Sequence, residues 1–235
     1  MPNKLQKGYT MLELTFVIVI ISLLISAVYN GYSLIQTAKL RSIITESKDF
    51  INAVNLFEQT YGSLPGDFPT ASNVWGANCD STPSNCNGDG DGITRFTASS
   101  TNQNEALRAW QHLALAGMIK GKYNGVSTVA VFNLDQYNSP VSNYNNSAFW
   151  SFYYNYPYNP PDYEGQFIQL VNFYGQNIIT PNNAYTIDAK IDDGLPRNGL
   201  VWAEGSLCTN DGTTPSTYNL GELNPYCWIK FVFRK

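Results

Sequence analysis

The residues best placed to do chemistry lie near the start of the chain, where Glu13 stands at the head of a long apolar run. From Leu14 to Ala38 the sequence contains no charged residue. A helix needs about 20 apolar residues to cross a bilayer, and this run is long enough. Because a bare carboxylate in hydrocarbon costs several kcal/mol, Glu13 is expected to have a partner.

The residues on either side of Glu13 form a recognisable pattern. Lys4 and Lys7 precede Gly8, and Tyr9-Thr10-Met11-Leu12-Glu13-Leu14 follows. This pattern closely resembles the N-terminus of type IV pilins and of the pilin-like subunits (pseudopilins) of type II secretion. The resemblance implies that a membrane-embedded prepilin peptidase cuts after Gly8 and that the new amino group of Tyr9 is methylated. It also implies that Glu13 pairs with the N-terminal amine of a neighbouring subunit during assembly.

Two other interpretations of the apolar run stay open at this point. A cleaved secretory signal has an apolar core of about 7–15 residues and a small-residue cleavage site. The run here is longer, and no clean Ala-x-Ala follows it. A simple signal anchor would have the length but no need of Glu13. The sequence also departs from the family, with Tyr9 where many pilins have Phe and Asn30 where many have a helix-kinking proline.

Composition and the resemblance together divide the chain into four segments. Residues 1–8 are a basic leader that the resemblance implies is cleaved. Residues 9–38 are the membrane-spanning half of a helix, for which the resemblance implies a role in assembly, and residues 39–61 are its amphipathic half. In that second half apolar residues recur at helical spacing, for example at Ile43, Val54 and Phe57. Residues 62–235 are of a size that suits one extracytoplasmic globular domain. The resemblance implies an α+β pilin-like fold, with the long helix packed on an antiparallel sheet.

Local patterns predict the elements of that domain. Asn102–Met118 reads as a helix with a capping box of Asn102 and Glu105, and Thr180-Pro181 opens another helix. Alternation in Cys227–Phe233 predicts a half-buried antiparallel strand, with Cys227, Ile229, Phe231 and Phe233 on one face and Trp228, Lys230 and Val232 on the other. Segments rich in Val, Ile and aromatic residues predict four further strands, at Thr128–Leu134, Phe149–Tyr154, Gln166–Phe173 and Gly199–Ala203.

The four cysteines, Cys79, Cys86, Cys208 and Cys227, indicate disulfide bonds. Their spacing favours Cys79–Cys86 and Cys208–Cys227, but four cysteines allow three pairings and sequence alone does not choose. Disulfides require an oxidising compartment, so the large domain is expected to face the periplasm. Together with the resemblance, this predicts a single-pass protein of the bacterial inner membrane that later enters a cell-surface or periplasmic filament.

A possible calcium site lies in Asn87-Gly88-Asp89-Gly90-Asp91-Gly92. Oxygen side chains on alternate residues can wrap a hard cation, so Asn87, Asp89 and Asp91 are candidate ligands. The bidentate Glu of a complete EF-hand loop is missing, and Ala98 stands in its place. The alternative interpretation is a tight Asp-Gly turn without a metal.

Charge and motifs narrow the functional classes. The net charge is −4 with no basic stripe, which argues against nucleic acid as a partner. No nucleophile–base set or phosphate loop is recognised. His112 is the only histidine, and it is expected at the surface or packed in the interior. We therefore expect that the protein is not an enzyme.

The leading hypothesis is therefore a filament subunit. Its expected partners are copies of itself or related pilin-like subunits, the prepilin peptidase, the inner-membrane assembly machinery and membrane lipid. The alternative is a membrane-anchored module that recognises a glycan or surface through Tyr- and Asn-rich loops at Gln136–Ser147 and Asn155–Glu164. Aromatic side chains could stack on sugars there, the candidates being Tyr153, Tyr154, Tyr156, Tyr158 and Tyr163.

Overall fold

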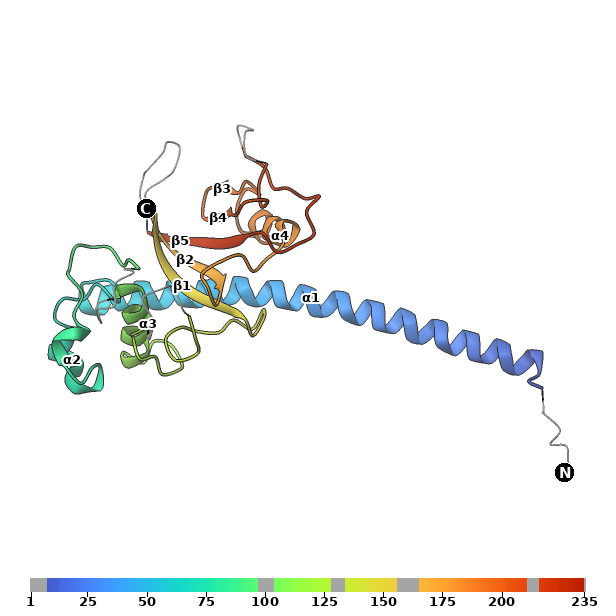
Figure 1. Cartoon of the computed structure of the whole chain (residues 1–235), viewed down its shortest axis with the longest axis horizontal. Coiled ribbons are helices and arrows are strands. Elements are labelled where there is room, and N and C mark those ends of the chain that lie inside the picture. Colours follow the sequence, from blue (N-terminus) through green and yellow to red (C-terminus); the bar gives the residue numbers. More distant parts are fainter. Residues whose placement is uncertain (1–7, 97–103, 128–133, 156–164, 211–215, 235) are drawn as a thin grey trace, which may run out of the picture. The chain divides into compact units, whose positions relative to one another are not determined.

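The computed structural model describes residues 8–96, 104–127, 134–155, 165–210 and 216–234. Two units form along the chain, residues 1–41 and residues 42–235, and the boundary between them falls inside the first helix. The fold is α+β, with a long N-terminal helix and a five-stranded antiparallel sheet (Figure 1).

The long helix α1 runs from Met11 to Tyr61 without interruption, because the sequence has no proline between Pro2 and Pro65. It ends at Gly62, whose φ of 71° few other residues adopt. Residues 8–30 are all exposed, whereas Ile43, Val54 and Phe57 of the second half are buried. Among the described helices, α1 alone is long and apolar enough to cross a membrane, with a mean hydropathy of 2.6 over its most apolar window.

The sheet has the strand order β1-β2-β5-β4-β3, and every neighbouring pair is antiparallel. Helix α3 packs beside β1 at one end of this order, and α4 packs beside β4 near the other end (Figure 1). The strands are β1 (Ala148–Asn155), β2 (Gly165–Asn172), β3 (Arg197–Asn198), β4 (Val201–Glu204) and β5 (Trp228–Arg234). The other helices are α2 (Ala71–Trp75), α3 (Glu105–Leu115), α4 (Pro181–Ile191) and the 3-10 turns η1 (Gly76–Asn78) and η2 (Pro83–Cys86).

Phe50 joins the second half of α1 to the rest of the globular unit. Its ring lies 4.9 Å from that of Trp110 on α3 and 5.6 Å from that of Trp150 on β1, edge-on to both. Trp110 and Trp150 are both completely buried. Such edge-to-face contacts add to the burial of apolar area, so this aromatic junction anchors α1 on the sheet.

Most of the predicted elements are confirmed. The strands predicted at Phe149–Tyr154, Gln166–Phe173, Gly199–Ala203 and Cys227–Phe233 correspond to β1, β2, β4 and β5 to within about two residues. Thr180 is the N-cap of α4, and its hydroxyl oxygen accepts the backbone N–H of Asn183 at 3.3 Å. Of the strand predicted at Thr128–Leu134, residues 128–133 lie outside the described residues.

Two predictions were wrong in detail. Glu105 is the first residue of α3 and not a capping-box partner, because its buried carboxylate accepts the backbone N–H groups of Asp89 and Arg95. Asn102, the other half of the predicted box, lies outside the described residues. Lys230 is only 1% exposed, so β5 is buried at this lysine on its second face as well as on its apolar face. The Glu204 carboxylate, 2.8 Å from the Lys230 ammonium, makes that burial tolerable.

Candidate functional site

Glu13 lies at the first turn of α1, where it forms a reciprocal capping box with Thr10. The Glu13 Oε2 atom accepts the backbone N–H and the hydroxyl of Thr10, both at 2.9 Å. In return the Thr10 hydroxyl oxygen accepts the backbone N–H of Glu13 at 3.2 Å. The box satisfies donors that every helix N-terminus leaves free, and it fixes the carboxylate at the head of the helix.

Thr10 is therefore a site residue whose capping role the sequence analysis missed. The signal was present, because Thr-x-x-Glu directly before an apolar run is the sequence signature of a capping box.

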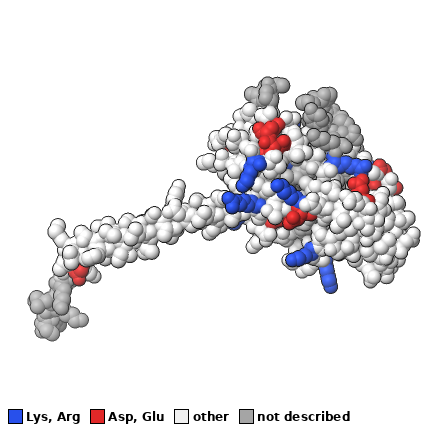
Figure 2. Space-filling view, turned by 180° about the vertical axis from the view of Figure 1, so that it is seen from behind, with Lys and Arg blue, Asp and Glu red and all other residues white. Residues whose placement is uncertain are grey.

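The surface behind Glu13 is apolar on every side. All residues from Gly8 to Asn30 are exposed, including Phe16, Ile20 and Leu24 at 61%, 56% and 60%. Figure 2 shows that lysine, arginine, aspartate and glutamate gather on the globular unit and leave a long stretch of α1 bare. A helix that is apolar all round is stable only when lipid or other protein covers it.

The predicted processing residues, Gly8 and Tyr9, lie just before the helix and are accessible. Tyr9 is 89% exposed, and a Cβ atom added at Gly8 would meet no atom of the described residues within 4 Å. The packing of the chain thus sets no requirement for glycine at position 8.

Both cysteine pairs favoured by spacing lie at disulfide distance. The Cα atoms are 5.9 Å apart in Cys79–Cys86 and 5.0 Å apart in Cys208–Cys227, within the normal range for a disulfide. The first bond closes a short loop against α3. The second joins the segment after β4 to the residue before β5.

The Cys79–Cys86 loop is held on α3 by a buried polar network. Arg108 forms an ion pair with Asp80 at 2.6 Å, and the Gln111 amide donates to the Cys79 carbonyl at 2.6 Å.

His112 Nδ1 accepts the backbone N–H of Gly66 at 3.0 Å, so its Nε2 is assigned as the donor to the Cys86 carbonyl at 2.9 Å. Complete burial lowers the His112 pKa to about 3, which keeps the ring neutral. His112 is thus a packed histidine.

Each predicted calcium ligand accepts a backbone N–H group, and Asp89 Oδ1 accepts that of Asp91 at 3.1 Å. Asn87 Oδ1 accepts the N–H of Ser72 at 2.8 Å, and Asp91 Oδ1 accepts the N–H of Ile93 at 2.9 Å. The centre of the loop belongs to Asp67, whose carboxylate accepts the N–H groups of Gly90, Asp91 and Gly92 at 2.6, 3.1 and 2.9 Å. Asp67 was not a candidate in the sequence analysis, because it lies more than 20 residues from these donors.

A group of three carboxylates does form beside this loop, from Asp67, Asp89 and Glu105. Burial raises the pKa of Glu105 to about 7, and the neighbouring carboxylates of Asp89 and Asp67 add to the rise. Burial likewise raises the pKa of Asp67.

Calcium binding at the loop stays a prediction. It is tested by thermal melts with and without millimolar calcium. A rise in melting temperature that Asp89→Asn abolishes would support it, and an unchanged melting temperature would remove it.

The comparisons with known proteins bear on the N-terminus alone. Residues 3–29 match the family model described as the prokaryotic N-terminal methylation motif. Nothing among the curated proteins or the solved structures matches the chain. The matched residues include Gly8, Tyr9, Thr10 and Glu13. The chain therefore carries the prepilin-type N-terminal signature, at the head of a long apolar helix.

Proposed function

We propose that this protein is a structural subunit, a pilin or pilin-like protein, of a type IV pilus or a type II secretion-like filament. In this proposal a prepilin peptidase removes residues 1–8, and the subunit then assembles through α1 with copies of itself or related subunits. Before assembly the apolar half of α1 anchors the chain in the inner membrane, with residues 62–235 in the periplasm.

The observation that carries the proposal is a capped carboxylate at the head of a helix exposed on all sides. Residues 8–30 can be covered by lipid in the membrane and by other subunits in a filament. Thr10 donates two hydrogen bonds to Glu13, but threonine is neutral and leaves the negative charge of the carboxylate in place. An ammonium group from a neighbour would supply that charge, because burying a carboxylate and an amine together removes a cost that neither bears alone.

The geometry at Gly8 also supports processing. Because the packing of the described residues does not require a glycine there, we infer that the peptidase recognises this position. Cleavage after Gly8 would place a new amino group on Tyr9, one residue before Thr10.

Mass spectrometry of the protein from its native host tests the processing step. We expect a mature chain that begins with N-methyl-Tyr9. An intact Met1, or a cut far downstream, would reject the proposal.

Filament recovery from sheared cells tests assembly. We expect the Glu13→Ala and Glu13→Gln variants to be processed but not to enter filaments. They should stay in the membrane, because neither variant carries the negative charge that would pair with the amine of a neighbouring subunit. Glu58→Gln, an exposed carboxylate on the same helix, is the matched control and should assemble like the wild type. If Glu13→Ala assembles as well as the wild type, the role assigned to Glu13 is wrong.

The alternative, glycan recognition by the Tyr- and Asn-rich loops, has less support. Tyr153 and Tyr154 belong to β1, and Tyr154 is only 9% exposed. Tyr156, Tyr158 and Tyr163 lie outside the described residues. A filament-free protein that binds oligosaccharides would favour this alternative.

A further inference from the structure

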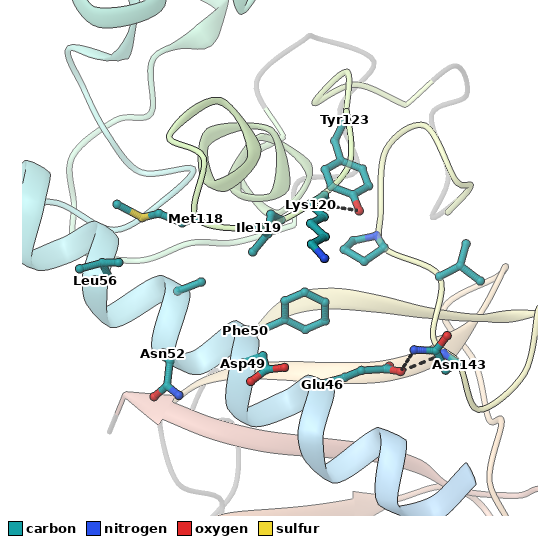
Figure 3. A pocket seen from close by; sticks show the side chains of 13 residues that line it. Glu46, Asp49, Phe50, Asn52, Leu56, Met118, Ile119, Lys120, Tyr123 and Asn143 are labelled. Carbon is teal, nitrogen blue, oxygen red and sulfur yellow. Dashed lines mark hydrogen bonds between the residues drawn. The ribbon is translucent and has the colours of Figure 1, made fainter. Parts of the chain in front are cut away.

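A groove of about 740 Å³ opens on the globular unit beside α1 (Figure 3). One wall is formed by α1 residues 46–56 and the other by residues 118–123, which follow α3. Residues 140–143 close one end. The groove is therefore at the β1 end of the sheet, where α3 packs.

The end of the groove is held in place by Glu46. Its carboxylate accepts the Ser142 hydroxyl at 2.6 Å and the backbone and side-chain N–H groups of Asn143 at 2.9 and 2.8 Å. The Trp150 indole N–H donates to the same carboxylate at 2.7 Å. The groove is thus preformed, and an occupant would pay little to order it.

The lining of the groove combines apolar surface with charges of both signs, since Lys120 lies on one wall and Glu46 and Asp49 lie on the other. Leu56 and Val141 are 52% and 41% exposed, and the Phe50 ring lies between the walls. Figure 3 shows the Lys120 side chain pointing from its segment toward α1. Within the part of the chain that the structure describes, the Lys120 ammonium has no hydrogen bond or ion pair. An apolar side chain would complement the apolar part of this lining, and a carboxylate next to it would complement Lys120.

The turn at residues 222–224 of the same unit has that chemistry. Leu223 is 84% exposed, which makes it the most exposed large apolar side chain among the described residues of 42–235. Glu222 precedes it, and Glu222 Oε1 accepts the backbone and side-chain N–H groups of Asn224 at 2.8 and 2.9 Å. These bonds stiffen the turn that presents Leu223.

The residues before and after this turn are also held in place. Cys227 is bonded to Cys208, and the Tyr218 hydroxyl donates to Asp188 of α4 at 2.7 Å. Because α4 packs beside β4, the turn is on the opposite side of the strand order from the groove.

We propose that Glu222 and Leu223 of one subunit dock into this groove on the next copy, with Leu223 on the apolar lining and Glu222 against Lys120. The inference rests on the proposed function, for which it names a contact. Because the turn and the groove lie at different places on one molecule, this contact is a head-to-tail interface. Such an interface produces an open chain of subunits unless its rotation closes a ring.

Filament recovery from cells making the full-length chain tests the contact. We expect Leu223→Asp to lower recovery by about tenfold or more, because it removes a buried leucine from every interface. Leu220→Asp is the matched control, since Leu220 is half exposed in the same loop. It should assemble normally. Both changes are at the surface, and melting curves should show both variants folded.

A charge exchange tests the ion pair. Lys120→Glu and Glu222→Lys should each lower recovery several-fold, and the double variant should recover most of the loss. Lys122→Glu, two residues from Lys120 and not part of the groove lining, is the control and should have no effect. Recovery that is unchanged in the single variants, or not restored in the double variant, would overturn the proposal.

A crosslink separates this inference from the proposed function. Leu223→Cys in one copy and Leu56→Cys in another should form an intermolecular disulfide on mild oxidation in the membrane. If Leu223→Asp assembles normally while Glu13→Ala does not, the contact is wrong and the filament function stands. If the wild type forms no filament, the proposed function fails and the crosslink alone decides the contact. A missing crosslink, or one to a different protein, would overturn docking between copies.

Discussion

Trp150 donates its indole N–H to the Glu46 carboxylate across 2.7 Å and so joins strand β1 to helix α1 over a sequence separation of 104 residues. The same carboxylate accepts hydrogen bonds from Ser142 and Asn143. Glu46 is thus the polar counterpart of the aromatic junction at Phe50. The two contacts lie one turn apart on α1, and together they hold the second half of the helix on the globular unit.

Glu46→Ala should destabilise the globular unit by about 2–4 kcal/mol, because it leaves several donors without their acceptor. Urea unfolding of the detergent-solubilised full-length chain, followed by tryptophan fluorescence, measures this. Glu58→Ala is the control. Its ion pair with Arg234 at 3.2 Å joins side chains that are both more than 40% exposed, and its loss should cost less than about 1 kcal/mol. Equal losses in the two variants would contradict the role assigned to Glu46.

The buried pair of Lys230 and Glu204 should behave as a unit. Glu204→Ala leaves a buried ammonium without its carboxylate, and we expect a loss of about 3 kcal/mol or more. Adding Lys230→Met should restore part of that stability, because an apolar side chain can be buried at this site without a charged partner. The Tyr153 ring, whose centroid is 4.3 Å from the Lys230 ammonium, would still pack against the methionine. If the double variant is less stable than Glu204→Ala, the pairing is not what makes the burial tolerable.

Removing the Cys208–Cys227 bond should cost more than removing the Cys79–Cys86 bond. The bonds separate their cysteines by 19 and 7 residues, and a longer closed loop constrains the unfolded chain more. We expect losses of about 3 kcal/mol and about 2.5 kcal/mol for the two double Cys→Ser variants. Peptide mapping without reduction checks the pairing itself, and any crossed pairing would contradict the structure.

Glu105 should make the folded protein less stable as the pH rises. Its folded pKa of about 7 is above the ordinary 4.5, so between these values the folded chain holds a proton that the unfolded chain has lost. This contribution to stability is present below pH 4.5 and is lost as the pH approaches 7. His112 acts in the opposite sense below about pH 6.5, because its folded pKa of about 3 is depressed.

The contribution of Glu105 is isolated by comparison with Glu105→Gln, which mimics the protonated side chain. In a chelator and at pH 8, we expect the variant to be more stable than the wild type by on the order of 1–2 kcal/mol, a value reduced for partial access to solvent. At pH 4 the two should be similar. Melting temperatures at both pH values measure this, and a variant that is less stable at pH 8 would show that the carboxylate is favoured as an ion.

The amino-acid sequence by itself determined the features that depend on neighbours along the chain. The apolar run predicted the long helix, segments rich in Val, Ile and aromatic residues predicted β1, β2 and β4, and alternation predicted β5. Thr180 and Pro181 predicted the start of α4. The Thr10–Glu13 capping box belongs to this class too, because its two members are one helical turn apart. Periodicity and capping act within a few residues, so a local pattern is enough to find them.

Only the tertiary structure decided which distant groups meet. It chose one of three cysteine pairings, placed the Asp67 carboxylate at the centre of the Asp-Gly loop, and buried Lys230 in a strand that was expected to be only half buried. It also brought Glu46 to Trp150. The physical reason is that each of these groups is satisfied by a partner from another segment. The identity of that partner depends on how the helices pack on the sheet, and the sequence near the residue does not predict it.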